Sequence, residues 1–173
     1  RSNGQKVEII MTRSVRFLSH ARLVAILLPV ALLGGALISE YVGGLFPCEM
    51  CLWQRWAHLA GIGAALAAIA LRKNPPASAT FALLAALFIA TSGIIGGFHA
   101  GVEYHWWEGF TSCTALRPAA GGSMLDTIMG APVIRCDQAQ WTLGGVSLAG
   151  FNALFSFGGA LVIFLFVRRW SRP

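Results

Sequence analysis

Residues 74–102 read NPPASATFALLAALFIATSGIIGGFHAGV and contain no Asp, Glu, Lys or Arg. About 20 consecutive apolar residues let a helix cross a bilayer, so this segment can span one and continue past the interface. Three further uncharged stretches occur at residues 23–39, 56–71 and 146–167. The stretch 56–71 is short on its own, so we extend its helix back through Cys51, which places Arg55 inside it. The sequence therefore predicts four membrane-spanning helices.

The overall composition agrees with a membrane protein. Of the 173 residues, 56% are hydrophobic and only 12% are charged, whereas soluble domains carry about 25% charged residues. Long helices buried in a soluble core would need charged outer faces, and this composition has too few charges to supply them. A soluble core, a disordered chain and a nucleic-acid-binding chain are therefore excluded as leading interpretations. Glycine and alanine dominate the second and third stretches, and such small residues let membrane helices approach closely.

Lys and Arg residues collect on one side of the predicted membrane, and cytoplasmic segments are the ones enriched in them. That side carries Arg1, Lys6, Arg13, Arg16, Arg22, Arg72, Lys73, Arg168, Arg169 and Arg172. The opposite side carries only Arg55, Arg117 and Arg135. We therefore predict an all-α membrane protein, a four-transmembrane-helix bundle with both termini cytoplasmic and a long outer loop between helices 3 and 4. The net charge of +6 reflects this topology, and no nucleic-acid partner is expected.

The predicted domain organisation is simple. Residues 1–22 form a cytoplasmic N-terminal segment. Residues 23–169 form one four-helix membrane domain with a redox loop at 103–145, and residues 170–173 form a cytoplasmic tail. Residues 1–10 fit neither a span nor a loop, and Met11 is a candidate natural start, so we treat 1–10 as a candidate non-native segment. We expect the first span to be retained, because no convincing small-x-small cleavage site follows it.

All four cysteines fall on the predicted non-cytoplasmic side, which is oxidising in bacteria and permits disulfides. Cys48 and Cys51 form a Cys-x-x-Cys pair at the start of a predicted helix, whereas Cys113 and Cys136 lie in the long loop. Cys51 falls in the first helical turn, where the backbone amides and the macrodipole favour a thiolate. Arg55 is four residues further on, hence on the same helix face. This arrangement indicates a redox centre at the membrane edge.

The cysteines and Arg55 also admit other interpretations. The long spacing between Cys113 and Cys136 opposes a four-cysteine zinc site, and no metal is expected. A disulfide between Cys48 and Cys51 closes so short a loop that it has little structural value. Arg55 either snorkels to lipid headgroups or anchors a polar or anionic ligand head near Cys51, and a quinone would suit such a site.

The sequence resembles the disulfide bond formation protein B (DsbB) family of bacterial inner-membrane thiol:quinone oxidoreductases, from about Arg16 to Arg169. The motifs that carry the resemblance are FPCEMCLWQR at 46–55, YHWWEG at 104–109 leading to Cys113, and PVIRCD at 132–137. Phe110 departs from the family, whose members often have proline at this point. This departure touches no redox group.

The resemblance implies that the 103–145 loop is periplasmic and that the inner membrane holds the chain. A reduced periplasmic thiol oxidase of the DsbA type would attack a Cys113–Cys136 disulfide at Cys113. Cys136 would then pass the electrons to the Cys48–Cys51 pair. Cys51 would deliver them to the membrane quinone pool, ubiquinone or menaquinone, with Arg55 stabilising the developing charge.

The roles of two histidines and one acidic residue near the predicted outer membrane boundary are less clearly indicated by the sequence. His99 lies near the outer end of the third span, where it either binds a quinone ring or packs against a neighbouring helix. His58 follows Gln54 by one turn and is a weaker candidate for the same cavity. Glu103 is expected to be an ordinary solvated acid of the loop or of the membrane interface. The main alternative to an enzyme is a non-catalytic membrane subunit whose two disulfides are structural.

Overall fold

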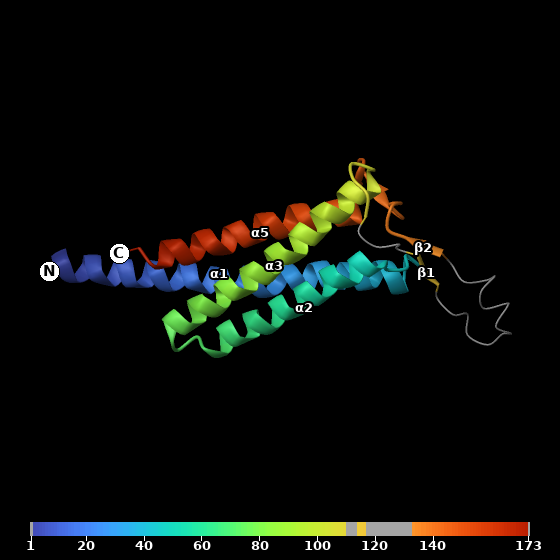
Figure 1. Cartoon of the computed structure of the whole chain (residues 1–173). Coiled ribbons are helices and arrows are strands. Elements are labelled where there is room, and N and C mark those ends of the chain that lie inside the picture. The colour runs from blue at the N-terminus through green and yellow to red at the C-terminus, as the bar shows by residue number, and fades with distance from the viewer. Residues whose placement is uncertain (1, 110–113, 117–132, 173) are drawn as a thin grey trace.

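The computed structural model describes residues 2–109, 114–116 and 133–172, and the side chains of 15–109 and 135–172. Four long helices run alongside one another (Figure 1): α1 (Ser2–Tyr41), α2 (Glu49–Ala70), α3 (Pro75–Glu103) and α5 (Leu148–Trp170). Two short antiparallel pairs join β1 (Thr114–Leu116) with β2 (Val133–Arg135) and β3 (Thr142–Leu143) with β4 (Val146–Ser147). The chain is thus mostly helical, as predicted, and the strand pairs are an addition to the predicted all-α class.

Three of the helices in the described part of the chain are long and apolar enough to cross a membrane: Val15–Tyr41, Pro75–Glu103 and Leu148–Trp170. The predicted second span is a helix, α2, but it is not among these three. Its outer half carries Gln54, Arg55 and His58, which lower its hydropathy. A membrane crossing by α2 therefore stays a prediction. At the N-terminus, α1 begins at Ser2, so residues 2–10, for which the sequence predicted neither a span nor a loop, are helical.

Both chain termini and the turn between α2 and α3 lie at one end of the bundle, and β1 and β2 lie at the other (Figure 1). Local sequence sets where the helices begin. Asn74 accepts a hydrogen bond from the backbone amide of Ala77, and prolines occupy the next two positions, where their missing N–H has no cost. Ser147 caps α5 in the same way through the amide of Gly150.

The contact between α2 and α3 is made by small residues. Alanines of α2 and α3 are buried together in the main core, namely Ala64, Ala65, Ala68, Ala79, Ala82, Ala85 and Ala86. A Cβ atom at Gly61 would lie only 3.5 Å from the Ile89 side chain. The predicted close approach of these helices is confirmed. Large apolar side chains such as Leu154, Leu161 and Phe164 are instead exposed, as on helices that face lipid.

The outer end of α3 is held against the start of α5. The Tyr104 hydroxyl donates to the carbonyl of Gly145 (2.9 Å) and accepts from the amide of Ser147 (2.8 Å). The chain then turns back, so that the Trp107 indole donates to the Phe98 carbonyl at 3.0 Å. The Tyr104 contacts fix the last turn of α3 relative to the start of α5, and the Trp107 contact holds the following residues against α3.

The packing of α3 predicts different effects for two adjacent glycines. An added Cβ at Gly96 would lie 3.0 Å from the Ala149 carbonyl oxygen and 2.9 Å from Asn152 Nδ2, whereas one at Gly97 would meet only the Ala153 Cβ at 3.8 Å. Both alanines gain the same helix propensity, about 1 kcal/mol. Gly96→Ala should therefore be about 1–3 kcal/mol less stable than Gly97→Ala, measured by unfolding in detergent. Equal stabilities would contradict this packing.

Candidate functional site

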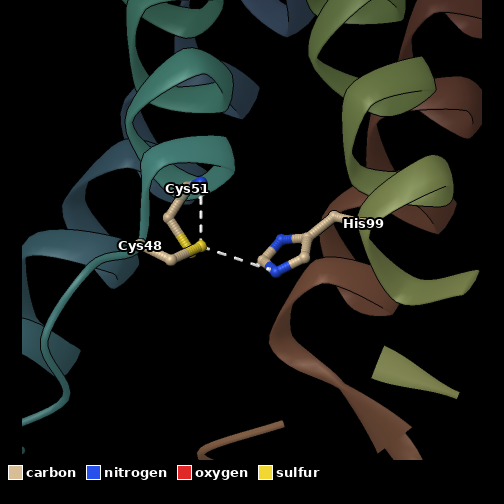
Figure 2. A group of neighbouring side chains, drawn as sticks. All are labelled: Cys48, Cys51 and His99. Atoms are coloured by element: carbon tan, nitrogen blue, oxygen red, sulfur yellow. Dashed lines mark hydrogen bonds between the residues drawn. The ribbon is translucent and has the colours of Figure 1, made fainter. Parts of the chain in front are cut away.

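Cys48 and Cys51 bring their sulfur atoms together at the start of α2. Figure 2 shows both side chains facing the His99 ring, which reaches across from α3. The two thiols are free, and the Cys48 thiol donates to Cys51 Sγ at 3.0 Å. Cys48 is also the N-cap of α2, since its sulfur accepts the backbone N–H of Cys51 at 3.3 Å. The arrangement is a dithiol that can close to a disulfide.

The two thiols are not equivalent. The hydrogen bond that Cys48 donates to Cys51, together with burial, raises the pKa of the Cys48 thiol. Cys48 is only 2% exposed, whereas Cys51 is partly exposed. Cys51 accepts the hydrogen bond and lies in the first turn of the helix, where the free backbone amides favour negative charge. Cys51 is therefore the sulfur that is better suited to carry a thiolate.

His99 and Glu103 lie one turn apart on α3 and face the dithiol. His99 Nε2 is 3.5 Å from Cys48 Sγ, and Cys51 Sγ lies within 4.8 Å of it. Glu103 Oε1 is 3.7 Å from the same nitrogen, and its side chain is only 7% exposed. The expectation of a solvated acid at Glu103 is wrong, because the turn at Tyr104 keeps this end of α3 against α5. The four-residue spacing from His99 was the signal in the sequence.

Arg55 forms an ion pair with Glu40 of α1, and its Nη2 donates to the Ala36 carbonyl at 3.1 Å. The side chains of Arg55 and Glu40 are 16% and 11% exposed, so the pair is largely buried. Arg55 thus points toward α1. Sequence reasoning missed this pairing, which depends on how α1 packs against α2.

A network of buried amides, imidazoles and hydroxyls connects α2, α3 and α5. Gln54 Nε2 donates to the Met50 carbonyl and to His99 Nδ1, each at 3.1 Å. Asn152 Nδ2 donates to Gln54 Oε1 at 2.8 Å, and His58 Nε2 lies 2.8 Å from Asn152 Oδ1. His58 therefore belongs to this network and does not contact the sulfur atoms.

A cavity of about 270 Å³ brings four of the predicted site residues together. Its lining includes Cys48, Cys51, Arg55 and His99, along with apolar side chains of α1 and α5. Among the described residues, three buried side-chain atoms have no hydrogen-bond partner: Arg55 Nε, His58 Nδ1 and Glu103 Oε2. All three belong to residues that line this cavity. Buried polar atoms are rarely left unpaired, so the site suits a ligand with both apolar and polar groups.

The loop cysteines are only partly described. Cys136 is disulfide-bonded and 2% exposed, and it packs in one buried cluster with Cys48, Met50 and Val102. Cys113 lies outside the described residues. Thr114, which follows it in the chain, pairs with Arg135, which precedes Cys136. The structure thus places one loop cysteine beside the dithiol of α2.

The inequality of the two thiols predicts their reactivity. In the reduced protein at neutral pH, Cys51 should be alkylated at least about tenfold faster than Cys48, since each unit by which a pKa is raised lowers the thiolate fraction about tenfold. Brief iodoacetamide treatment followed by peptide mass spectrometry measures both rates in one sample. Cys51→Ser provides the reference for Cys48 alone. Equal labelling of the two sites would show that the hydrogen bond between them does not govern their reactivity.

Comparison with known proteins agrees with this geometry. A protein of Rickettsia prowazekii (strain Madrid E), described as uncharacterized, is 25% identical over 147 residues, which is 83% of either chain. No solved structure matches the chain. The sequence model of the family described as disulfide bond formation protein DsbB matches residues 18–166, a range that includes all four cysteines. The chain therefore belongs to the DsbB family.

Proposed function

We propose that this chain is a membrane thiol:quinone oxidoreductase that reoxidises a periplasmic thiol oxidase of the DsbA type. Membership of the DsbB family indicates a disulfide-forming membrane oxidoreductase. The observation that carries the finer proposal is the dithiol of Cys48 and Cys51, which lines a largely apolar cavity and has Cys136 packed against it. Such an enzyme needs a cysteine that can exchange disulfides with the dithiol and a cavity next to the dithiol that can hold the electron acceptor.

The proposed thiol chemistry is a series of exchanges in which each bond formed replaces one broken. A partner thiolate attacks a Cys113–Cys136 disulfide at Cys113 and releases Cys136 as a thiolate. The second partner thiol displaces Cys113, which leaves the partner oxidised and the loop pair reduced. Cys136 then attacks the disulfide of Cys48 and Cys51, and Cys113 resolves the mixed disulfide. The burial of Cys136 beside Cys48 supports this order.

A quinone, ubiquinone or menaquinone, supplies a two-electron acceptor whose ring carries two carbonyl groups. The residues present fit such a group, because the cavity combines apolar walls with the unpartnered donor atom Arg55 Nε. Cys51 lines the cavity and is the better thiolate of the pair, so we assign it the final electron transfer. Arg55 and His99 would orient the ligand head near that sulfur.

The proposed setting is a bacterial inner membrane with both termini in the cytoplasm. The three long apolar helices support insertion in a membrane. The basic residues of the sequence gather near the termini and the α2–α3 turn, and these three segments lie at the same end of the bundle (Figure 1). The dithiol and β2 lie toward the other end, where a periplasmic partner would reach them.

A direct test mixes the purified protein with a quinone and a reduced DsbA-type oxidase and follows quinone absorbance. We expect the partner to be oxidised at the same rate as the quinone is reduced, and Cys51→Ser to abolish both. Absence of quinone reduction by the folded wild-type protein would favour the alternative of a non-catalytic subunit with structural disulfides.

The order of thiol exchange predicts a trapped intermediate. Cys136→Ala leaves Cys113 as a free thiol, which should attack the oxidised Cys48–Cys51 pair. A partner that keeps only its attacking cysteine should then displace the Cys48–Cys51 pair as a dithiol and remain bound through Cys113. Non-reducing electrophoresis and peptide mass spectrometry identify the adduct. An adduct through Cys48 or Cys51 would reverse the proposed direction of electron flow.

The ion pair between Arg55 and Glu40 allows the role of Arg55 in ligand binding to be separated from its role in stability. Arg55→Met should lower quinone-dependent turnover about ten- to a hundredfold, since a hydrogen bond to a charged group is worth about 1.5–3 kcal/mol. It should also destabilise the fold by about 3–5 kcal/mol, because Glu40 is left as a buried unpaired charge.

The matched control is the double variant Glu40→Gln with Arg55→Met, which removes both charges. Its stability should return toward that of the wild type, whereas its turnover should stay low and its KM for quinone high. Recovery of turnover together with stability would mean that Arg55 serves only as the partner of Glu40.

A further inference from the structure

The two ring nitrogens of His99 face groups of opposite hydrogen-bonding character. Nδ1 lies 3.1 Å from the amide nitrogen of Gln54, which is a donor. Nε2 lies 3.5 Å from Cys48 Sγ and 3.7 Å from Glu103 Oε1. The carboxylate accepts hydrogen bonds, and the Cys48 thiol already donates its one proton to Cys51, so its sulfur can only accept from His99. A neutral imidazole has one donor and one acceptor nitrogen, so its neighbours decide which nitrogen carries the proton.

The orientation of the Gln54 amide is fixed by partners other than His99. Its Nε2 donates to the Met50 backbone carbonyl, and its Oε1 accepts from Asn152 Nδ2. The Asn152 amide is fixed in turn, because Nδ2 also donates to the Ser92 backbone carbonyl at 3.2 Å. Each of these two side-chain amides faces a backbone carbonyl, which accepts a hydrogen bond from the amide N–H group and cannot pair with the amide oxygen. A flip of Gln54 would therefore break two hydrogen bonds and set like groups against each other.

We infer that Gln54 is a positioning residue that holds neutral His99 as the Nε2–H tautomer. His99 then directs an N–H group at the sulfur pair and donates a hydrogen bond to it when it is ionised. The lone pair that could take a proton from a thiol is on Nδ1, which faces Gln54. His99 thus stabilises a thiolate by donating a hydrogen bond to it. Only the use of that thiolate in electron transfer rests on the proposed function.

The same tautomer decides what else the site can bind. The donor atoms of Cys48, Cys51 and His99 all lie within 4.8 Å of one another, a spacing that suits a metal ion. A histidine that binds a metal through Nε2 must carry its proton on Nδ1 and donates it to a carbonyl or carboxylate. Gln54 offers a donor at that position. The structure therefore disfavours metal binding by the reduced dithiol. Thiol exchange requires this dithiol to remain free of metal.

The first experiment reads the tautomer directly. The ¹⁵N chemical shifts of labelled histidine in the full-length protein distinguish Nδ1–H from Nε2–H, and a His99→Asn sample assigns the signal. We expect neutral His99 in the wild type to be the Nε2–H form. A predominantly Nδ1–H form would overturn the inference. This measurement needs neither quinone nor a partner protein, so its failure is distinct from a failure of the proposed function.

The second experiment reverses the polarity at Nδ1. Gln54→Glu places a carboxylate where the donor was, so His99 should shift to the Nδ1–H form. The reduced protein should then bind Zn²⁺ about ten- to a hundredfold more tightly than the wild type, measured by competition with a chelator. Gln140→Glu is the matched control, because Gln140 also lines the cavity but bonds to the Phe46 carbonyl.

Two outcomes decide the second experiment. A gain in zinc affinity for Gln54→Glu but not for Gln140→Glu supports the inference, and equal affinities in all three proteins overturn it. Should Gln54→Glu fail to fold, Gln54→Met removes the donor without adding charge. That variant should lose the preference for the Nε2–H form, and an unchanged tautomer would overturn the inference.

Discussion

The close packing of α2 against α3 sets the distance between the dithiol and its polar surroundings. Small residues such as Gly61 and Ala85 let the two backbones approach, and Gly96 leaves room for the side chains of Gln54 and Asn152. A side chain at Gly96 would displace Gln54 and Asn152, and Gln54 is the residue that contacts His99 Nδ1. The redox chemistry therefore depends on a stripe of glycine and alanine that carries no chemical groups of its own.

Charge inside this bundle is tolerated because it is paired or directed at a cavity. Removing an ion from water is costly, and Arg55 recovers part of that cost from Glu40 and a backbone carbonyl of α1. The atoms that remain unpaired, such as Arg55 Nε and Glu103 Oε2, belong to side chains around one cavity. In the described part of the chain, the unpaired polar atoms thus lie around a cavity where a ligand could pair with them.

Sequence patterns predicted the parts of the fold that depend on local chemistry. The uncharged run 74–102 gave the third helix to within one residue at each end, because prolines and an asparagine cap mark its start. The positions of Cys51 and Arg55 on one helix face followed from helical spacing alone. The partner of Arg55 did not, since Glu40 is on another helix and their contact depends on tertiary packing. Glu103 was misjudged because its burial depends on a turn that folds back over α3.

Cys48 is the N-cap of α2 and, in the proposed function, also a redox sulfur, so electron transfer would also act on the end of a helix. Its sulfur holds the backbone amide of Cys51 as long as it is a good acceptor. A disulfide sulfur carries less negative charge than a thiol or thiolate, so oxidation weakens this cap and reduction strengthens it. By thermodynamic reciprocity, a well-formed first turn of α2 favours the reduced pair. The helix terminus thus opposes formation of the disulfide, because the hydrogen bond that caps the first turn weakens when the disulfide forms and strengthens when it is reduced.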